Sequence, residues 1–126
     1  MVTYKRLLIV GLLTLIPTIA QAQNPVAGPK SSFVFNQAAP LLTDAQGYTY
    51  RYYLDNGGAL TFVNVTCTGT ATPWTCQVLV PSMTQGSHSI TLTATSAAGE
   101  SPQSVPFAFA FVANPPTAPT SIRVIP

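Results

Sequence analysis

Charged side chains are the scarcest feature of this 126-residue chain. Only 6% of its residues are Asp, Glu, Lys or Arg, and five cations against three anions leave a formal net charge of +2. Lys5 and Arg6 account for that excess, because Lys30, Arg51 and Arg123 equal the three acids in number. Nucleic-acid binders carry clustered Lys and Arg. We therefore expect no nucleic-acid partner.

Residues that carry catalysis or bind metals are also few. The chain has one histidine, His88, and the serines on either side of it alternate onto the opposite face of a strand. A nucleophile needs a base in reach, zinc and copper sites need several ligands, and glycoside hydrolysis needs paired carboxylates. Asp44, Asp55 and Glu100 all stand in turn-like contexts. We expect no enzyme, no cofactor and no metal site, with His88 as a corner or core residue.

The longest apolar run lies within residues 1–22. Lys5 and Arg6 precede it, and Ala20-Gln21-Ala22 supplies the small residues that a signal peptidase requires. A membrane anchor is the alternative, but the run is shorter than the ~20 residues of a membrane span. We expect cleavage before Gln23, and a secreted or periplasmic protein with no stable membrane span after cleavage.

Cysteine occurs twice, at Cys67 and Cys76. An even number of cysteines in an exported protein indicates a disulfide. A metal site is the alternative, but two thiols without paired histidines would make a poor one. The sequence therefore predicts a Cys67–Cys76 disulfide.

Strong helix formers such as Glu and Lys are rare, whereas β-branched and aromatic residues are plentiful, which favours strands. A period of two is clearest over Tyr48–Asp55 and Ser87–Thr95. In the second segment the period directs Leu92 inward and Thr93 to solvent. Other strands are predicted at 31–37, 59–66, 77–80 and 105–112, with a loop over 38–47 and a tight turn at 56–58.

These segments predict one all-β sandwich over residues 31–112. Residues 1–22 are the signal peptide, 23–30 a lead-in segment and 113–126 a Pro-rich tail. The order of short strands and turns is typical of an antiparallel sandwich and not of a helical or βαβ fold.

The stretch Met83–Phe111 resembles the second half of fibronectin type III and related bacterial immunoglobulin-like domains. The features shared with that family are a Gly turn, alternating apolar residues, a Gly-containing hairpin and a Ser-rich lead into the last strand, at Gly86, His88, Ile90, Leu92, Ala94, Gly99, Glu100-Ser101 and Ser104. Tyr50–Asp55 is similar to the third strand of the family and Phe33–Phe35 to its second. The resemblance implies an immunoglobulin-like (fibronectin type III-like) antiparallel β-sandwich of six to seven strands. Two departures are that strand A has no clear counterpart, and that His88 replaces a Tyr that ties down a corner.

Trp74, between the two cysteines, has two interpretations. It is either a buried cap over the sandwich edge or a rigid aromatic anchor for a ligand, and Tyr53, outward on its strand, would extend such a binding surface. We expect a secreted, non-catalytic binding or structural module that contacts a protein or a glycan through loops or sheet edges. A small inhibitor of a secreted enzyme, presenting the Cys67–Cys76 loop, is one alternative.

A subunit of a cell-surface assembly is the other alternative, and it depends on the tail. Ile122, Arg123 and Val124 alternate like a strand after a Pro-rich linker. An isolated apolar strand seeks a sheet edge, so self-association through the tail competes with a frayed terminus.

Overall fold

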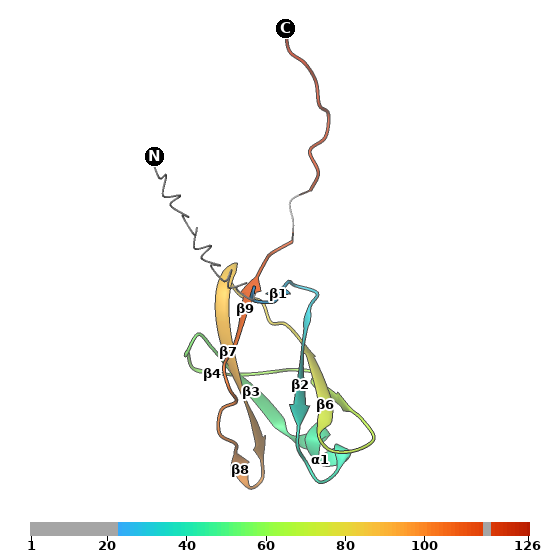
Figure 1. Ribbon diagram of the computed structural model, residues 1–126, viewed down its shortest axis with the longest axis vertical. Coiled ribbons are helices and arrows are strands. Elements are labelled where there is room, and N and C mark those ends of the chain that lie inside the picture. The colour runs from blue at the N-terminus through green and yellow to red at the C-terminus, as the bar shows by residue number, and fades with distance from the viewer. Residues whose placement is uncertain (1–22, 115–116) are drawn as a thin grey trace, which may run out of the picture.

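The computed structural model describes residues 23–114 and 117–126, so the predicted signal peptide lies outside the described residues. They form two β-sheets with one short helix (Figure 1). In chain order the elements are β1 (Val26–Ala27), β2 (Ser32–Gln37), α1 (Leu42–Gly47), β3 (Thr49–Leu54), β4 (Ala59–Thr61), β5 (Thr66–Thr68), β6 (Trp74–Leu79), β7 (Gly86–Ser96), β8 (Gly99–Glu100) and β9 (Phe107–Phe111). The predicted all-β, two-sheet class is confirmed.

The larger sheet has the strand order β1-β9-β7-β3-β4, with β8 paired to β7, and the smaller sheet has the order β2-β6-β5. Only the β1–β9 pair is parallel among the described strands. The chain changes sheet between β1 and β2, between β2 and β3, between β4 and β5, and between β6 and β7. Consecutive strands therefore face each other across the core at several points.

The core lies between the inner faces of the two sheets. Ile90 and Phe109 of the larger sheet are 2% and 1% exposed, and Cys76 of the smaller sheet is fully buried. The Phe35 ring packs edge-on against Tyr50, with 5.2 Å between ring centroids. Aromatic rings of the two sheets thus pack against each other across the core.

The predicted alternation over Tyr48–Asp55 is confirmed, because Tyr50 and Tyr52 are buried on one face. One prediction for β7 is wrong: Thr93 is 4% exposed, whereas Leu92 is only half-buried. Thr93 does lie on the outer face, where its Oγ1 donates to Glu100 Oε1 at 2.6 Å. The outer-face side chains bury Thr93, since a central strand has neighbours on both sides.

The loop predicted over 38–47 is also wrong, because α1 occupies Leu42–Gly47. Three turn formers suggested a loop: Pro40 precedes this short helix, Asp44 lies in its first turn and Gly47 is its last residue. The Leu41 N–H donates to Asp44 Oδ2 at 3.1 Å, which ties down the start of the helix. Ala45, on the inner side of the helix, is fully buried.

The strand predicted over 59–66 is two strands in different sheets, β4 and β5, and the strand predicted at 77–80 begins earlier, at Trp74. Cys67 and Cys76 lie directly opposite each other on β5 and β6 and form a disulfide with a Cα–Cα distance of 4.0 Å. The predicted disulfide is confirmed, and it joins two neighbouring strands of the smaller sheet.

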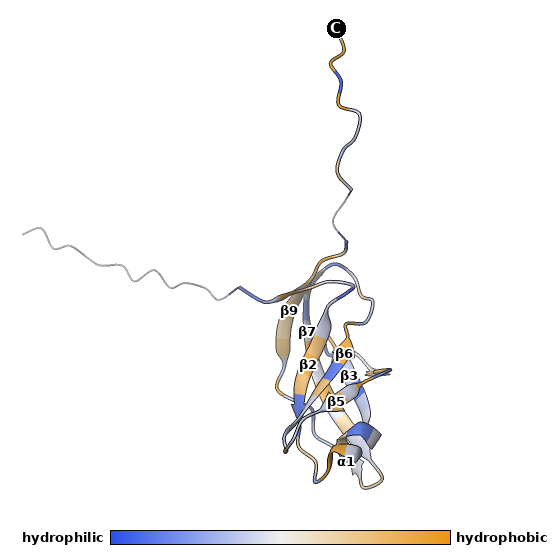
Figure 2. Cartoon of the chain, turned by 90° about the vertical axis from the view of Figure 1, so that its right-hand side faces the viewer, coloured by the Kyte–Doolittle hydropathy of each residue, from blue (hydrophilic) through white to orange (hydrophobic). Residues whose placement is uncertain are grey.

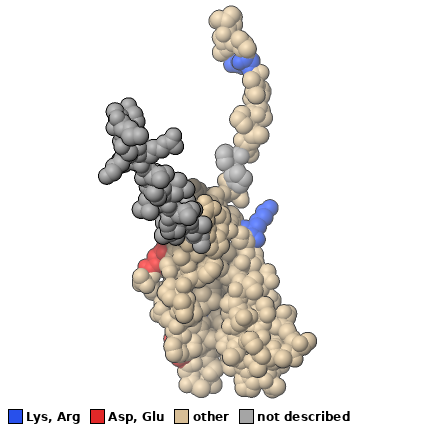
Figure 3. Space-filling view, viewed as in Figure 1, with Lys and Arg blue, Asp and Glu red and all other residues tan. Residues whose placement is uncertain are grey.

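Residues 117–126 form neither a helix nor a strand and stand clear of the sheets, with alternating hydrophobic and hydrophilic colours towards the terminus (Figure 2). Ile122 and Val124 are 93% and 94% exposed. Charged side chains are sparse on the face that Figure 3 presents. No helix within 23–114 and 117–126 is long and apolar enough to cross a membrane.

Candidate functional site

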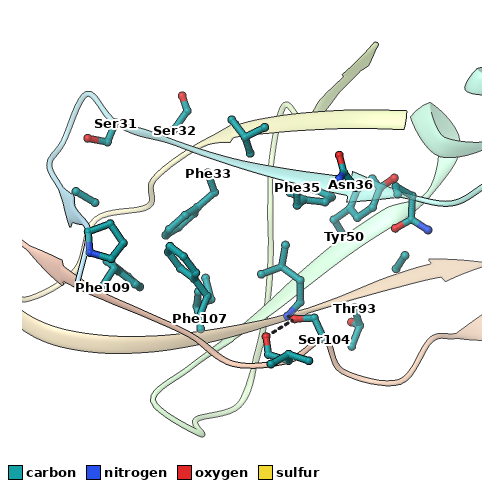
Figure 4. A pocket seen from close by; sticks show the side chains of 18 of the residues that line it. Ser31, Ser32, Phe33, Phe35, Asn36, Tyr50, Thr93, Ser104, Phe107 and Phe109 are labelled. Carbon is teal, nitrogen blue, oxygen red and sulfur yellow. Dashed lines mark hydrogen bonds between the residues drawn. The ribbon is translucent and has the colours of Figure 1, made fainter. Parts of the chain in front are cut away.

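An apolar groove opens between the two sheets, between β2 and the chain from Ser101 to Phe109. It encloses about 710 Å³. Phe33 and Phe35 reach into it from β2, and Phe107 and Phe109 face them from the other wall (Figure 4). The Phe33 and Phe109 rings meet edge-on, with 5.2 Å between centroids. The groove walls are thus the inner faces of both sheets.

Phe107 shows that the core is uncovered along this groove. Phe107 and Phe109 are two residues apart on β9 and therefore share a face. Phe109 is 1% exposed, whereas Phe107 is 49% exposed. A side chain that faces inward and is half in water indicates that no described element covers this part of the core.

The first rim of the groove is the free edge of β2, since β2 pairs only with β6 among the described strands. The Val80 N–H donates to Ser31 O at 2.9 Å, which makes residues 31 and 80 a hydrogen-bonded pair. Hydrogen bonding alternates along an antiparallel ladder. The backbone N–H and C=O groups of Ser32, Val34 and Asn36 therefore point away from β6, towards the open side.

The second rim is the lower part of β9. Ala110 and Val112 donate their N–H groups to Pro25 O and Ala27 O, both at 2.9 Å, which holds β1 against the upper part of β9. Residues 23–30, predicted as a lead-in, thus contribute β1. Ala108 points its N–H the same way as Ala110, but β1 ends its pairing at Ala110 and Phe111. Two strand edges with free backbone groups therefore flank one apolar groove.

His88 lies apart from the groove rims, at the start of β7. Its Nδ1 is 2.7 Å from Asp55 Oδ2 and its Nε2 is 2.6 Å from Thr84 O. Asp55 and Asn56 have positive φ values of 51° and 59°, as in the type I′ turn that joins twisted strands. That turn aims the Asp55 carboxylate at His88, and Asp55 Oδ1 also accepts the Ser89 N–H at 2.8 Å.

Both ring nitrogens of His88 face acceptors, an arrangement that is best satisfied when the ring carries a proton on each nitrogen. The hydrogen bond to Asp55, followed by the one to the Thr84 carbonyl, raises the pKa of His88 above its ordinary 6.5. The same hydrogen bond, followed by that from Ser89, lowers the pKa of Asp55 below 3.8. His88 is therefore a corner residue that fastens two turns, and it has no free nitrogen to serve as a base.

Tyr53 and Glu100 form a separate cluster on the outer face of the larger sheet. The Tyr53 hydroxyl donates to Glu100 Oε1 at 2.9 Å, and Arg51 Nη1 lies 3.4 Å from Glu100 Oε2. The hydrogen bonds from Thr93 and Tyr53 lower the pKa of Glu100, and Arg51 adds to this effect. The hydroxyl of Tyr53 is thus already engaged within the fold.

Trp74 lies on the inner side of β6 and is 8% exposed. Its indole N–H donates to Ala39 O at 2.9 Å. Nearby, the buried Tyr50 hydroxyl donates to Ala45 O at 2.7 Å and lies 3.7 Å from each disulfide sulfur, and burial raises the pKa of Tyr50 to about 12. Trp74 therefore belongs to the core, and the structure does not bring it together with Tyr53.

The described residues contain no group of three or more His, Cys, Asp or Glu that could hold a metal ion. Comparisons with protein-family models, with curated proteins and with solved structures found no match for this chain. The groove residues were not among the candidates that the sequence offered. The signal for them was present in Phe107, Phe109 and Phe111 on one strand face, combined with the lack of a clear strand A.

Proposed function

We propose that this protein is an exported, non-catalytic immunoglobulin-like module that binds an extended segment of polypeptide as an added strand in the groove. The single observation that carries the proposal is the apolar groove between the free edge of β2 and the lower part of β9, which β1 does not cover. Strand addition uses this combination, because backbone groups on the edge give affinity and pockets for alternate side chains give specificity.

The strand connectivity supports the immunoglobulin-like part of the proposal. In that fold, strands A, B, E and D form one sheet and C, F and G the other, which C′ can extend. The order β2-β6-β5 corresponds to B-E-D, and β9-β7-β3-β4 corresponds to G-F-C-C′. Strand A, the neighbour of B, has no counterpart beside β2 among the described residues, and its position is the open groove.

His88 supports the same assignment from a side-chain contact. In immunoglobulin-like domains a Tyr near the start of strand F hydrogen-bonds to the backbone a few residues upstream. Here the His88 Nε2 makes the corresponding bond to Thr84 O, four residues upstream at the start of β7. The missing tyrosine is thus replaced by another donor.

The chemistry of the groove favours a polypeptide over a glycan. Its walls carry phenylalanine rings from both sheets, and its rims offer backbone N–H and C=O groups in strand geometry. The engagement of both His88 nitrogens supports the absence of catalysis at the only histidine. The small residues at Ala20-Gln21-Ala22 support export.

A fluorescein-labelled decapeptide of alternating Thr and Val, flanked by lysines, provides a generic strand probe for fluorescence anisotropy. We expect saturable binding, and no binding of the same peptide with proline at two central positions. Val34→Pro removes one free N–H at the β2 edge, and Phe107→Ala removes part of the apolar wall. Each change should weaken binding about tenfold, since a hydrogen bond or a half-buried ring contributes about 1–1.5 kcal/mol.

Thr61→Pro is the matched control, at the other edge of the larger sheet. Phe62 donates its N–H to Tyr50 O, so the neighbouring Thr61 N–H points away from β3. This variant should bind the probe like the parent protein. Equal affinity of the parent, Val34→Pro and Phe107→Ala proteins would refute binding in the groove.

A further inference from the structure

We propose that the natural occupant of the groove is the C-terminal tail of a second copy of this chain, with residues 122–125 added as a strand beside β2. This inference rests on the proposed function, and it names the partner of the same groove. The chain would then carry both halves of one contact: a groove with no strand beside β2, and an exposed apolar segment that lies outside both sheets.

The first argument is the side-chain pattern of the tail. Ile122 and Val124 share one face of an extended segment, and Arg123 and Ile125 share the other. Only the first face can enter a groove lined by phenylalanines, because the second would bring the Arg123 cation into it. The alternation therefore fixes which side chains point inward and leaves Arg123 in water.

The second argument is exposure. Ile122, Val124 and Ile125 are 93%, 94% and 76% exposed, although exposed apolar side chains on an unpaired extended segment are a liability in water. Phe107, inside the groove, is 49% exposed. Strand addition would remove apolar surface on both partners at once, which is the main favourable term in association.

The third argument concerns which copy supplies the tail. The tail leaves the end of β9 beside β1, which fills the upper edge of β9 through the Pro25 and Ala27 carbonyls. To enter its own groove, the tail would have to reverse direction and pass β1. The tail points away from the sheets instead (Figure 1), which leaves it placed to reach a neighbouring molecule. Repetition of this head-to-tail contact builds rings or open chains.

The test uses the full chain, expressed in a host that processes it, and two variants with complementary defects. Val34→Pro damages the groove and keeps the tail, whereas Val124→Asp damages the tail and keeps the groove. Multi-angle light scattering over a range of concentrations should find oligomers of the parent and monomers of each variant alone. A mixture of the two variants should form heterodimers, because only one contact can be made. Thr117→Asp adds the same charge outside the strand segment and should associate like the parent.

A synthetic peptide of residues 117–126 gives a second, direct measurement. It should bind the Val124→Asp protein, should not bind the Val34→Pro protein, and should dissociate the parent oligomers when added in excess. A groove that binds the Thr-Val probe but not this peptide would overturn the inference and leave the proposed function intact. Failure of both peptides to bind would overturn both.

A tail that fills its own groove is distinguished by the same set of proteins. The parent would then be a monomer at every concentration, Val124→Asp would be less stable than the parent, and the variant mixture would give no heterodimer. That result would overturn assembly between copies. In a control mixture, a Thr117→Asp and Val34→Pro double variant replaces the Val124→Asp protein, so that both partners have a damaged groove. Heterodimers that form in the first mixture and not in this control would support assembly between copies.

Discussion

Two phenylalanines on the same face of β9 provide a quantitative test of the groove. Phe109 is 1% exposed and its ring contacts Phe33, whereas Phe107 is 49% exposed. Phe109→Ala should cost about 3–5 kcal/mol of unfolding free energy, because it loses a fully buried ring and leaves a cavity. Phe107→Ala should cost about 1 kcal/mol, because full burial of a Phe side chain contributes about 1.5–3 kcal/mol and Phe107 is only half-buried.

Urea unfolding measures both costs, and the single tryptophan, Trp74, reports the transition because it is buried in the folded state. The measurement belongs in the Val124→Asp background, where the groove stays empty. Equal costs at the two positions would show that the groove is closed in solution and would refute the assignment of an open side. In the parent protein at high concentration, a strand bound in the groove should raise the unfolding free-energy cost of Phe107→Ala towards that of Phe109→Ala. The m-value of the monomeric variants should stay unchanged.

Three further predictions concern the parts that hold the sandwich together. Reduction of the Cys67–Cys76 disulfide should remove about 2.7 kcal/mol in the chain-entropy model and lower the melting temperature by at least several degrees; an unchanged melting temperature would contradict this. The His88–Asp55 pair should contribute most to the free energy of unfolding between about pH 4 and pH 6.5. The pKa of His88 is raised, so its contribution is lost as pH rises through that pKa, and the pKa of Asp55 is lowered, so its contribution is lost as pH falls through that pKa. Thermal unfolding of His88→Tyr, which keeps a donor for Thr84 O, should lack the decline above pH 6.5. Thr93→Val should cost about 1.5–3 kcal/mol, as expected for a hydrogen bond to a charged acceptor, whereas the exposed Thr49→Val should change stability by less than about 0.5 kcal/mol.

The sequence was most informative where a local pattern determines the structure. The period of two over Tyr48–Asp55 predicted which tyrosines are buried, because alternation and burial are both properties of a single strand. It was least informative where the outcome depends on contacts between distant segments. Thr93 is buried because Glu100 and Tyr53 cover the outer face, and α1 forms where Pro40 and Gly47 suggested a loop. Neither result follows from the residues on one segment alone.

The candidate site divides in the same way. Trp74, between the two cysteines, and Tyr53, outward on its strand, were the binding candidates, since rigid aromatic side chains dominate binding surfaces. Trp74 is buried in the core and its indole N–H donates to Ala39 O, whereas the Tyr53 hydroxyl donates to Glu100 Oε1. The groove could be anticipated only from the lack of a clear strand A, because a missing neighbour leaves no motif in the sequence. Its position required the pairing of β2 and β9.

An open groove also requires that the sandwich remain folded without a strand beside β2, and the remaining contacts indicate how it does so. At one end, His88 fastens the Asp55 turn and the Thr84 segment, and β1 is held on β9. At the other end, the disulfide, the Tyr50 hydroxyl and α1 lie together. The two ends are fixed while the middle is uncovered, so the groove is formed before any partner arrives. Binding then requires little ordering of the receiving side, which reduces the entropic cost of association, and that cost falls chiefly on the tail.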